Sequence, residues 1–177
     1  KTGEFYLLQI RPMVDNRMQL DENLADIPDE QCLLRSHNAI GHGIITDICD
    51  IVYVKTSEKA HYTPGWNPQI AEEVERINRT LLQEDRKCIL IGPGRWGSSD
   101  PWLGIPVKWP NISSAQVIVE AGLANFQVDP SQGTHFFQNL TSLGVGYLTI
   151  NAFRGDGKYD CTLFENLPLA QETEHVA

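Results

Sequence analysis

Residues 133–140, with the sequence Gly-Thr-His-Phe-Phe-Gln-Asn-Leu, hold the side chains best placed to do chemistry. Thr134 is a suitable N-cap and Gly144 a suitable stop, so the run predicts a short helix with His135 in its first turn. Free backbone N–H groups and the positive end of the helix dipole favour a phosphate there. A neutral imidazole can itself attack a phosphoryl group. We therefore expect His135 to carry phosphate and Thr134 to help bind it; the alternative is a capping or surface histidine.

A second run, residues 89–97, has the sequence Ile-Leu-Ile-Gly-Pro-Gly-Arg-Trp-Gly and matches the strand and G-x-G-x-x-G pattern of dinucleotide-binding proteins. That function requires the last glycine to open a helix and Glu120, at the end of a later apolar strand, to reach a ribose. Pro101 and Pro106 argue against such a helix. We expect a rigid loop instead, in which Arg95 contacts a phosphate or a neighbouring domain. Dinucleotide binding is the lesser alternative.

Composition limits the classes of partner. The chain has 177 residues and a formal net charge of −9 at pH 7, which argues against nucleic-acid and anionic membrane surfaces as partners. It has no apolar run long enough to span a bilayer. Its cysteines and histidines lack the spacing of metal ligands, so no metal site is expected, and His175 has no constellation around it. We expect Cys49 and Cys88 to be reduced core residues and the protein to be cytoplasmic.

Apolar periodicity predicts the elements that position these residues. Residues 68–84 form the best helix, because their apolar side chains follow helical spacing. In the His135 helix, Phe136, Leu140 and Leu143 are expected to share one face that packs on a sheet. Strands are expected as a pair within 39–54, and then at 87–91, 115–120, 145–151 and 159–164. The fold class is α/β, with a mixed sheet and flanking helices over residues 31–165.

Several segments resemble the phosphoenolpyruvate synthase and pyruvate phosphate dikinase family. Residues 5–12 end in Leu-Gln-x-Arg-Pro and resemble the closing strand of that family's ATP-grasp domain. Residues 39–54 resemble the glycine-punctuated first hairpin of its phosphohistidine domain, and residues 89–102 resemble the next strand and its proline-containing loop. Residues 134–145, from Thr-His to Leu-Gly-Val, fall where that domain carries its phosphorylated histidine.

The resemblance implies a division of the chain. Residues 1–14 would be the last strand of an ATP-grasp nucleotide-binding domain, and residues 15–30 a linker. Residues 31–165 would form a swivelling phosphohistidine-like domain, and residues 166–177 a tail or the start of a following segment. The chain would therefore be a piece of a longer polypeptide whose other domains are its partners.

The same resemblance implies that the parent protein is an ATP-dependent phosphotransferase. Gln9 and Arg11 point to one face of their strand and would hold ATP with Mg²⁺. His135 would carry a phosphoryl group between ATP and pyruvate, with phosphoenolpyruvate as the product. The isolated segment is then expected to be inactive. The alternative for Arg11 is a surface residue on an edge strand.

Two phenylalanines follow His135, where the family has small residues. This departure leaves a further alternative, in which the domain has lost its chemistry and serves as a docking or regulatory module. A buried imidazole packed under Phe136 and Phe137 would favour that alternative.

Overall fold

The structure is a computed structural model that describes residues 27–40, 44–56, 62–123, 125–127, 129–131, 134–159, 164 and 167–177. Gln9 and Arg11 lie outside these residues, as do the strand expected around them and most of the expected linker. Within the described ranges the chain forms a mixed sheet with two α-helices, which confirms the predicted α/β class.

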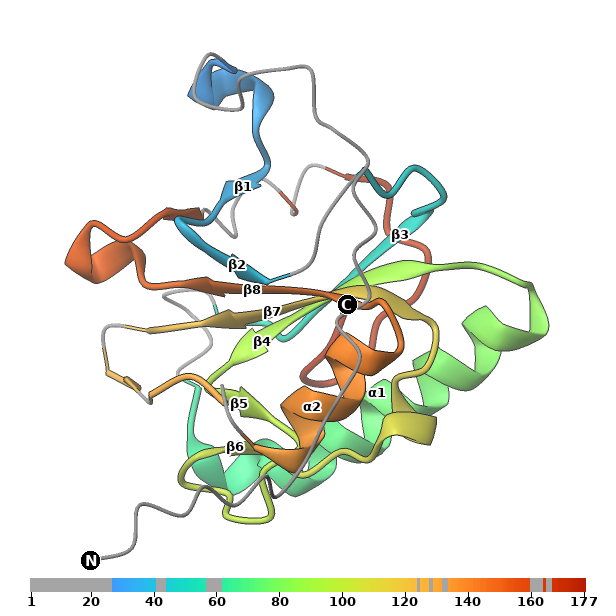
Figure 1. Ribbon diagram of the computed structural model, residues 1–177. Coiled ribbons are helices and arrows are strands. Elements are labelled where there is room, and N and C mark those ends of the chain that lie inside the picture. The colour runs from blue at the N-terminus through green and yellow to red at the C-terminus, as the bar shows by residue number, and fades with distance from the viewer. Residues whose placement is uncertain are drawn as a thin grey trace, which may run out of the picture.

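A five-stranded sheet forms the centre of the described chain, with its strands in the order β2-β8-β7-β4-β3 (Figure 1). β2 (Asn38–Ile40) lies antiparallel against β8 and closes one edge. The other strands are parallel to one another: β3 (Asp50–Tyr53), β4 (Cys88–Pro93), β7 (Ala115–Ala121) and β8 (Gly146–Ile150). Aliphatic and β-branched residues fill the central strands, as expected for strands covered on both faces.

The connections between the parallel strands all return on one face of the sheet (Figure 1). The helix α1 (Asn67–Gln83) links β3 to β4, close to its predicted bounds, and α2 (His135–Ser142) links β7 to β8. Between β4 and β7, the short strands β5 (Arg95–Trp96) and β6 (Gly104–Ile105) pair with each other. Short 3-10 helices occupy Asp29–Gln31, Pro64–Trp66, Trp109–Asn111 and Ala152–Arg154.

Side chains alternate between two apolar clusters along the central strands, as the pleat of a sheet requires. Leu90, Ile118 and Tyr147 face α1 and α2 in the larger cluster. On the opposite face, β1 (Leu34–Arg35) pairs with β9 (Lys158–Tyr159) and supplies a smaller cover. The strand residues buried there are Ile91, Val119 and Ile150, together with Phe164.

The structure corrects the expected hairpin within residues 39–54. Both strands form, but β2 and β3 lie at opposite edges of the sheet. Residues 44–49 carry the chain between them without regular secondary structure. The parallel register of β3 with β4 places apolar side chains of both strands in the same clusters, which a hairpin with the short, exposed strand β2 would not do.

Two apolar residues also lie elsewhere than expected. Leu140 is fully buried, but Leu143 is 54% exposed. The helix ends at Ser142, and Gly144 turns the chain with a φ of 74°, so Leu143 leaves the apolar face. Gly144 thus confirms the predicted stop. Cys88 is buried as expected, whereas Cys49 is exposed because it precedes β3.

The outer edge of β3 is covered by the last residues of the chain. The N–H of Tyr53 donates to the carbonyl of Ala177 at 2.7 Å, and the N–H of Ala177 donates back at 3.0 Å. The N–H of Lys55 donates to the carbonyl of His175 at 2.8 Å, and Val54 forms an antiparallel bridge with Val176. The tail therefore extends the sheet by one short antiparallel segment.

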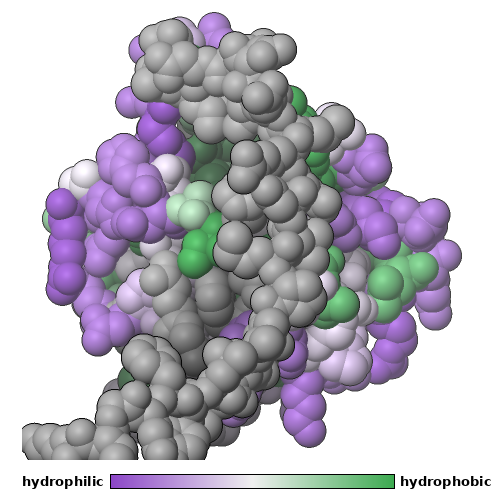
Figure 2. Space-filling view, viewed as in Figure 1, coloured by the Kyte–Doolittle hydropathy of each residue, from purple (hydrophilic) through white to green (hydrophobic). Residues whose placement is uncertain are grey.

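The described surface is mostly hydrophilic on the face shown in Figure 2, where apolar residues form only small patches. The most exposed large apolar side chains come from separate parts of the sequence: Trp102, Ile44, Leu169 and Phe153. No helix in the described part of the chain has both the length and the apolar composition that crossing a bilayer requires.

Leu140 and Leu143 give a matched test of how α2 packs. Leu140→Ala should lower the free energy of unfolding by about 2–5 kcal/mol, because it opens a cavity under the helix. Leu143→Ala should change it by less than about 0.5 kcal/mol, because that side chain is mainly in solvent. Urea unfolding of both variants measures the difference. Equal losses would contradict the described orientation of α2.

Candidate functional site

The parallel strands β3, β4, β7 and β8 all end on the same side of the sheet, here called its carboxyl edge, and α1 and α2 begin there. In open α/β sheets, ligands bind outside the carboxyl ends of the strands. Arg95 follows β4 at this edge, and Thr134 and His135 lie where α2 starts. Three of the predicted site residues therefore share one edge of the sheet.

His135 is the first residue of α2 and is exposed. The next residue, Phe136, is partly buried and packs against the larger apolar cluster. Its ring lies against the backbone of Gly97, where a Cβ atom would come within 2.4 Å of it. Consecutive side chains therefore point different ways, the imidazole toward solvent and the phenyl ring toward the core. The side chain of Phe137 lies outside the described part of the structure.

Thr134 fixes the start of α2. Its carbonyl accepts the N–H of Gln138 at 3.0 Å, as the carbonyl of an N-cap residue does. Its hydroxyl donates to the carbonyl of Ser131 at 2.8 Å, and its N–H donates to the same carbonyl at 3.1 Å. Thr134 therefore occupies the position before the helix that the sequence predicted, and it joins that position to the preceding segment.

Arg95 holds the segment that leads into α2. Its Nε donates to the carbonyl of Asp129 at 2.6 Å, and the side chain is only partly exposed. Asp129 is two residues before Ser131, the partner of Thr134. The guanidinium therefore adds a positive charge to the same edge as the N-terminus of α2.

Glu120 is a buried carboxylate at the end of β7, with four hydrogen-bond donors around it. It accepts the N–H of Trp96 at 3.0 Å and the N–H of Ser131 at 2.9 Å. The hydroxyls of Ser131 and Tyr147 also donate to it, each at 2.5 Å. Burial and the adjacent Glu120 carboxylate raise the pKa of Tyr147, so the phenol stays protonated and donates. The carboxylate thus connects β5, the segment before α2, and β8.

This arrangement argues against the dinucleotide alternative. Glu120 is 5% exposed and bonded to donors of its own chain, so its carboxylate is not presented to a ribose. After Gly97 the chain forms a turn and β6, not a helix. The parallel strands also follow one another across the sheet in a single direction, without the reversal at which a dinucleotide crevice opens.

The glycines in this run lie against aromatic rings. A Cβ atom on Gly92 would come within 2.4 Å of the Trp96 ring, and one on Gly94 within 2.5 Å of the Phe126 ring. Gly97 meets the ring of Phe136 in the same way. Gly94 and Gly97 also have φ angles of 67° and 80°. The expected loop is shorter than predicted, because Gly92 belongs to β4 and Arg95 to β5, and the glycines of this run serve close packing.

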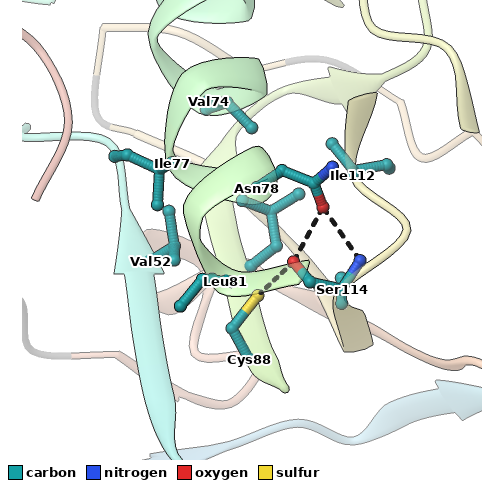
Figure 3. Close-up of a pocket in the computed structure, with 10 residues that line it drawn as sticks. Val52, Val74, Ile77, Asn78, Leu81, Cys88, Ile112 and Ser114 are labelled. Atoms are coloured by element: carbon teal, nitrogen blue, oxygen red, sulfur yellow. Dashed lines mark hydrogen bonds between the residues drawn. The ribbon is translucent and has the colours of Figure 1, made fainter. Parts of the chain in front are cut away.

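A small cavity between α1 and the sheet is shown in Figure 3. Asn78 Oδ1 accepts the N–H of Ser114 at 2.9 Å and its hydroxyl at 2.8 Å, and Cys88 Sγ lies 3.5 Å from that hydroxyl. The cavity measures about 10 Å³, too little for a substrate. Burial raises the pKa of Cys88 to about 11, so its thiol is protonated and unreactive. These residues serve packing.

A second cluster of polar side chains lies between α1 and the tail: Glu73, Glu174 and His175, whose potential ligand atoms all lie within 4.8 Å of one another. Burial would raise the pKa of Glu73, but hydrogen bonds from Thr173, the His175 N–H and Gln69 outweigh it, so the pKa is lowered overall. The expectation that His175 has no constellation around it is therefore wrong. One feature of the sequence could have indicated this cluster: Glu73 places a carboxylate between Ile70 and Val74 on the apolar face of α1.

Comparisons with protein-family models, with curated proteins and with solved structures found no match for this chain.

Gly97 and Gly144 test whether the first glycine supports the Phe136 ring. Both have positive φ angles, but a Cβ atom on Gly144 would meet nothing within 4 Å. Gly144→Ala should therefore cost only the backbone strain, about 1–2 kcal/mol of unfolding free energy. Gly97→Ala should cost about 2–5 kcal/mol, because the ring must also move. Equal costs in denaturant titrations would show that Phe136 does not press on Gly97.

The carboxylate of Glu120 should be sensitive even to an isosteric change. Glu120→Gln places an amide NH₂ among hydrogen-bond donors, which should lower the free energy of unfolding by about 1.5–3 kcal/mol. Glu30→Gln, at an exposed position, should change it by less than about 0.5 kcal/mol. Chemical unfolding of both variants measures this. A neutral result at Glu120 would mean that its network contributes nothing to stability.

Proposed function

We propose that His135 carries a phosphoryl group within an ATP-dependent phosphotransferase similar to phosphoenolpyruvate synthase. One observation carries this proposal: the imidazole of His135 is exposed in the first turn of α2, at the carboxyl edge of a parallel sheet. The N–H groups of a first helical turn, together with the helix dipole, stabilise an anion at this position. Arg95 adds a positive charge at the same edge.

The proposed step is a displacement at phosphorus. A ring nitrogen of the neutral imidazole donates its lone pair to the phosphorus, and an N–P bond forms. The bond from phosphorus to the bridging oxygen of the nucleotide breaks, and its electron pair leaves with that oxygen. No strong base is needed, so positioning and positive charge supply most of the catalysis. By the family resemblance, Gln9 and Arg11 would hold ATP, and Mg²⁺ would neutralise charge on its phosphates.

The acceptor in this proposal is pyruvate. A base on the other domain would take a methyl proton from pyruvate, and the oxygen of the resulting enolate would attack the phosphorus on His135. The N–P bond would break, its electron pair would return to the imidazole nitrogen, and phosphoenolpyruvate would form. This second transfer requires a site on another domain of the same polypeptide, so the exposed position of His135 is a precondition for it. A histidine that alternates between two sites must present its imidazole at the surface in both.

The exposed imidazole also separates this proposal from the docking alternative. A docking module that had lost its chemistry was expected to bury His135 under the neighbouring rings. The Phe136 ring instead packs against Gly97, on the inner side of α2, so it does not occupy the space that a phosphate would need. This arrangement favours the carrier over the docking module.

The test uses the full polypeptide with ATP labelled at the γ- or β-phosphate. The expected product is a protein-bound label that is lost in acid and stable in alkali, as for a phosphoramidate. His135→Ala should abolish the label. His37→Ala is the matched control, since His37 is also exposed, and it should leave the label unchanged. Label that persists in His135→Ala would overturn the proposal.

A further inference from the structure

The three side chains between α1 and the tail come from two distant parts of the sequence. Glu73 lies in the first half of α1, on its buried face, and is 2% exposed. His175 lies in the tail that covers β3 and is 8% exposed. Glu174 extends beside them, with its side chain 72% exposed. The cluster is therefore buried on one side and open to solvent on the other.

Glu73 is held rigidly as an acceptor. One of its oxygens accepts the Thr173 hydroxyl at 2.6 Å and the N–H of His175 at 2.9 Å. The other accepts only a long hydrogen bond of 3.3 Å from Gln69 Nε2, which also donates to Glu174 at 2.8 Å. The second oxygen of Glu73 therefore has the weaker hydrogen bonding of the two. Gln69 bridges the two carboxylates, which would otherwise repel each other.

The imidazole of His175 is fixed but incompletely bonded. Its ring stacks on that of Trp66, with ring centroids 4.7 Å apart and planes at 18°. Its Nε2 is buried and has no hydrogen-bond partner among the described residues, and it lies 4.0 Å from Glu174 Oε1. Such orphaned buried atoms are rare in native proteins because losing water without a replacement is unfavourable. The nitrogen thus has a lone pair or a proton to offer at the side where the two carboxylates lie.

We propose that Glu73, Glu174 and His175 bind a divalent transition-metal cation of the Zn²⁺ type. One imidazole nitrogen and two carboxylate oxygens form a ligand set that Zn²⁺ accepts, and their two negative charges match its charge. The potential ligand atoms now lie within 4.8 Å of one another. Bonds of about 2.0–2.2 Å to a single cation require these atoms to move slightly closer together. Glu174 can supply that movement because it is exposed.

The bound cation would have a structural consequence. It would join α1 to the tail, and so fasten the segment that pairs with the outer edge of β3. Three protein ligands also leave a fourth position for water. The proposal is independent of His135, which lies on α2 and not in this cluster.

The experiment titrates the chain with Zn²⁺ alone in a calorimeter, with a thermal melt in parallel. One Zn²⁺ should bind per chain, and it should raise the melting temperature because it binds only the folded cluster. Glu174→Gln and His175→Gln should each weaken binding at least about tenfold. Glu172→Gln is the matched control: it lies in the same tail and pairs with Lys55, so Zn²⁺ affinity should not change.

Co²⁺ alone then identifies the ligands, because it separates the proposed site from binding to thiolates, a ligand class that the chain's cysteines offer and that such metals accept. The expected spectrum has weak visible bands and no thiolate charge-transfer band. An unchanged affinity in Glu174→Gln overturns the proposal, and this exposed substitution should leave the fold intact. A thiolate band, or the absence of binding, overturns it as well. In the last case His175 would serve only to pack the tail on Trp66.

Discussion

The described fold depends most on the Glu120 carboxylate at the end of β7. Burying a charge is unfavourable unless hydrogen bonds replace its water, and here Trp96, Ser131 and Tyr147 supply them. These donors come from three segments, namely β5, the segment before α2, and β8, and hydrogen bonds fix direction in a way that apolar contacts do not. The carboxylate therefore sets the positions of β5 and of the segment before α2. The exposure of His135 follows from this constraint, because that segment determines where the helix starts.

The loop after β4 shows how a sequence pattern can serve packing alone. Its glycines match a phosphate-binding pattern, yet each lies against an aromatic ring. Glycine is required in both situations for the same reason, namely that another group approaches the backbone closely. The pattern therefore specifies the close approach but not the group that makes it. The aromatic residues that follow, Trp96, Phe126 and Phe136, are the part of the sequence that distinguishes the two cases.

Local patterns in the sequence predicted the helices and the longer strands well, but no pattern predicted which distant segments lie together. Apolar periodicity gave α1 and the parallel strands nearly at their observed bounds, since each buries a regular face. The pairing of strands could not be predicted in this way. β2 and β3 are close in sequence but lie at opposite edges of the sheet, because β3 pairs with β4, which follows it in the sequence after α1. The environment of His175 depends on Glu73, about a hundred residues earlier, and no spacing rule connects such positions. Of the predicted site, Arg95, Thr134 and His135 share one edge, and Gln9 and Arg11 lie outside the described residues.

The strand pairings at the two edges of the sheet have a consequence for how the chain folds. β2 pairs with β8, so Asn38 lies beside Thr149, and Val54 at the other edge lies beside Val176. Both contacts close very long loops, and such contacts form late because chain entropy opposes them. During synthesis, the outer edge of β3 therefore stays unpaired until residues 173–177 have left the ribosome. In that interval the nascent chain is most exposed to mispairing with other chains.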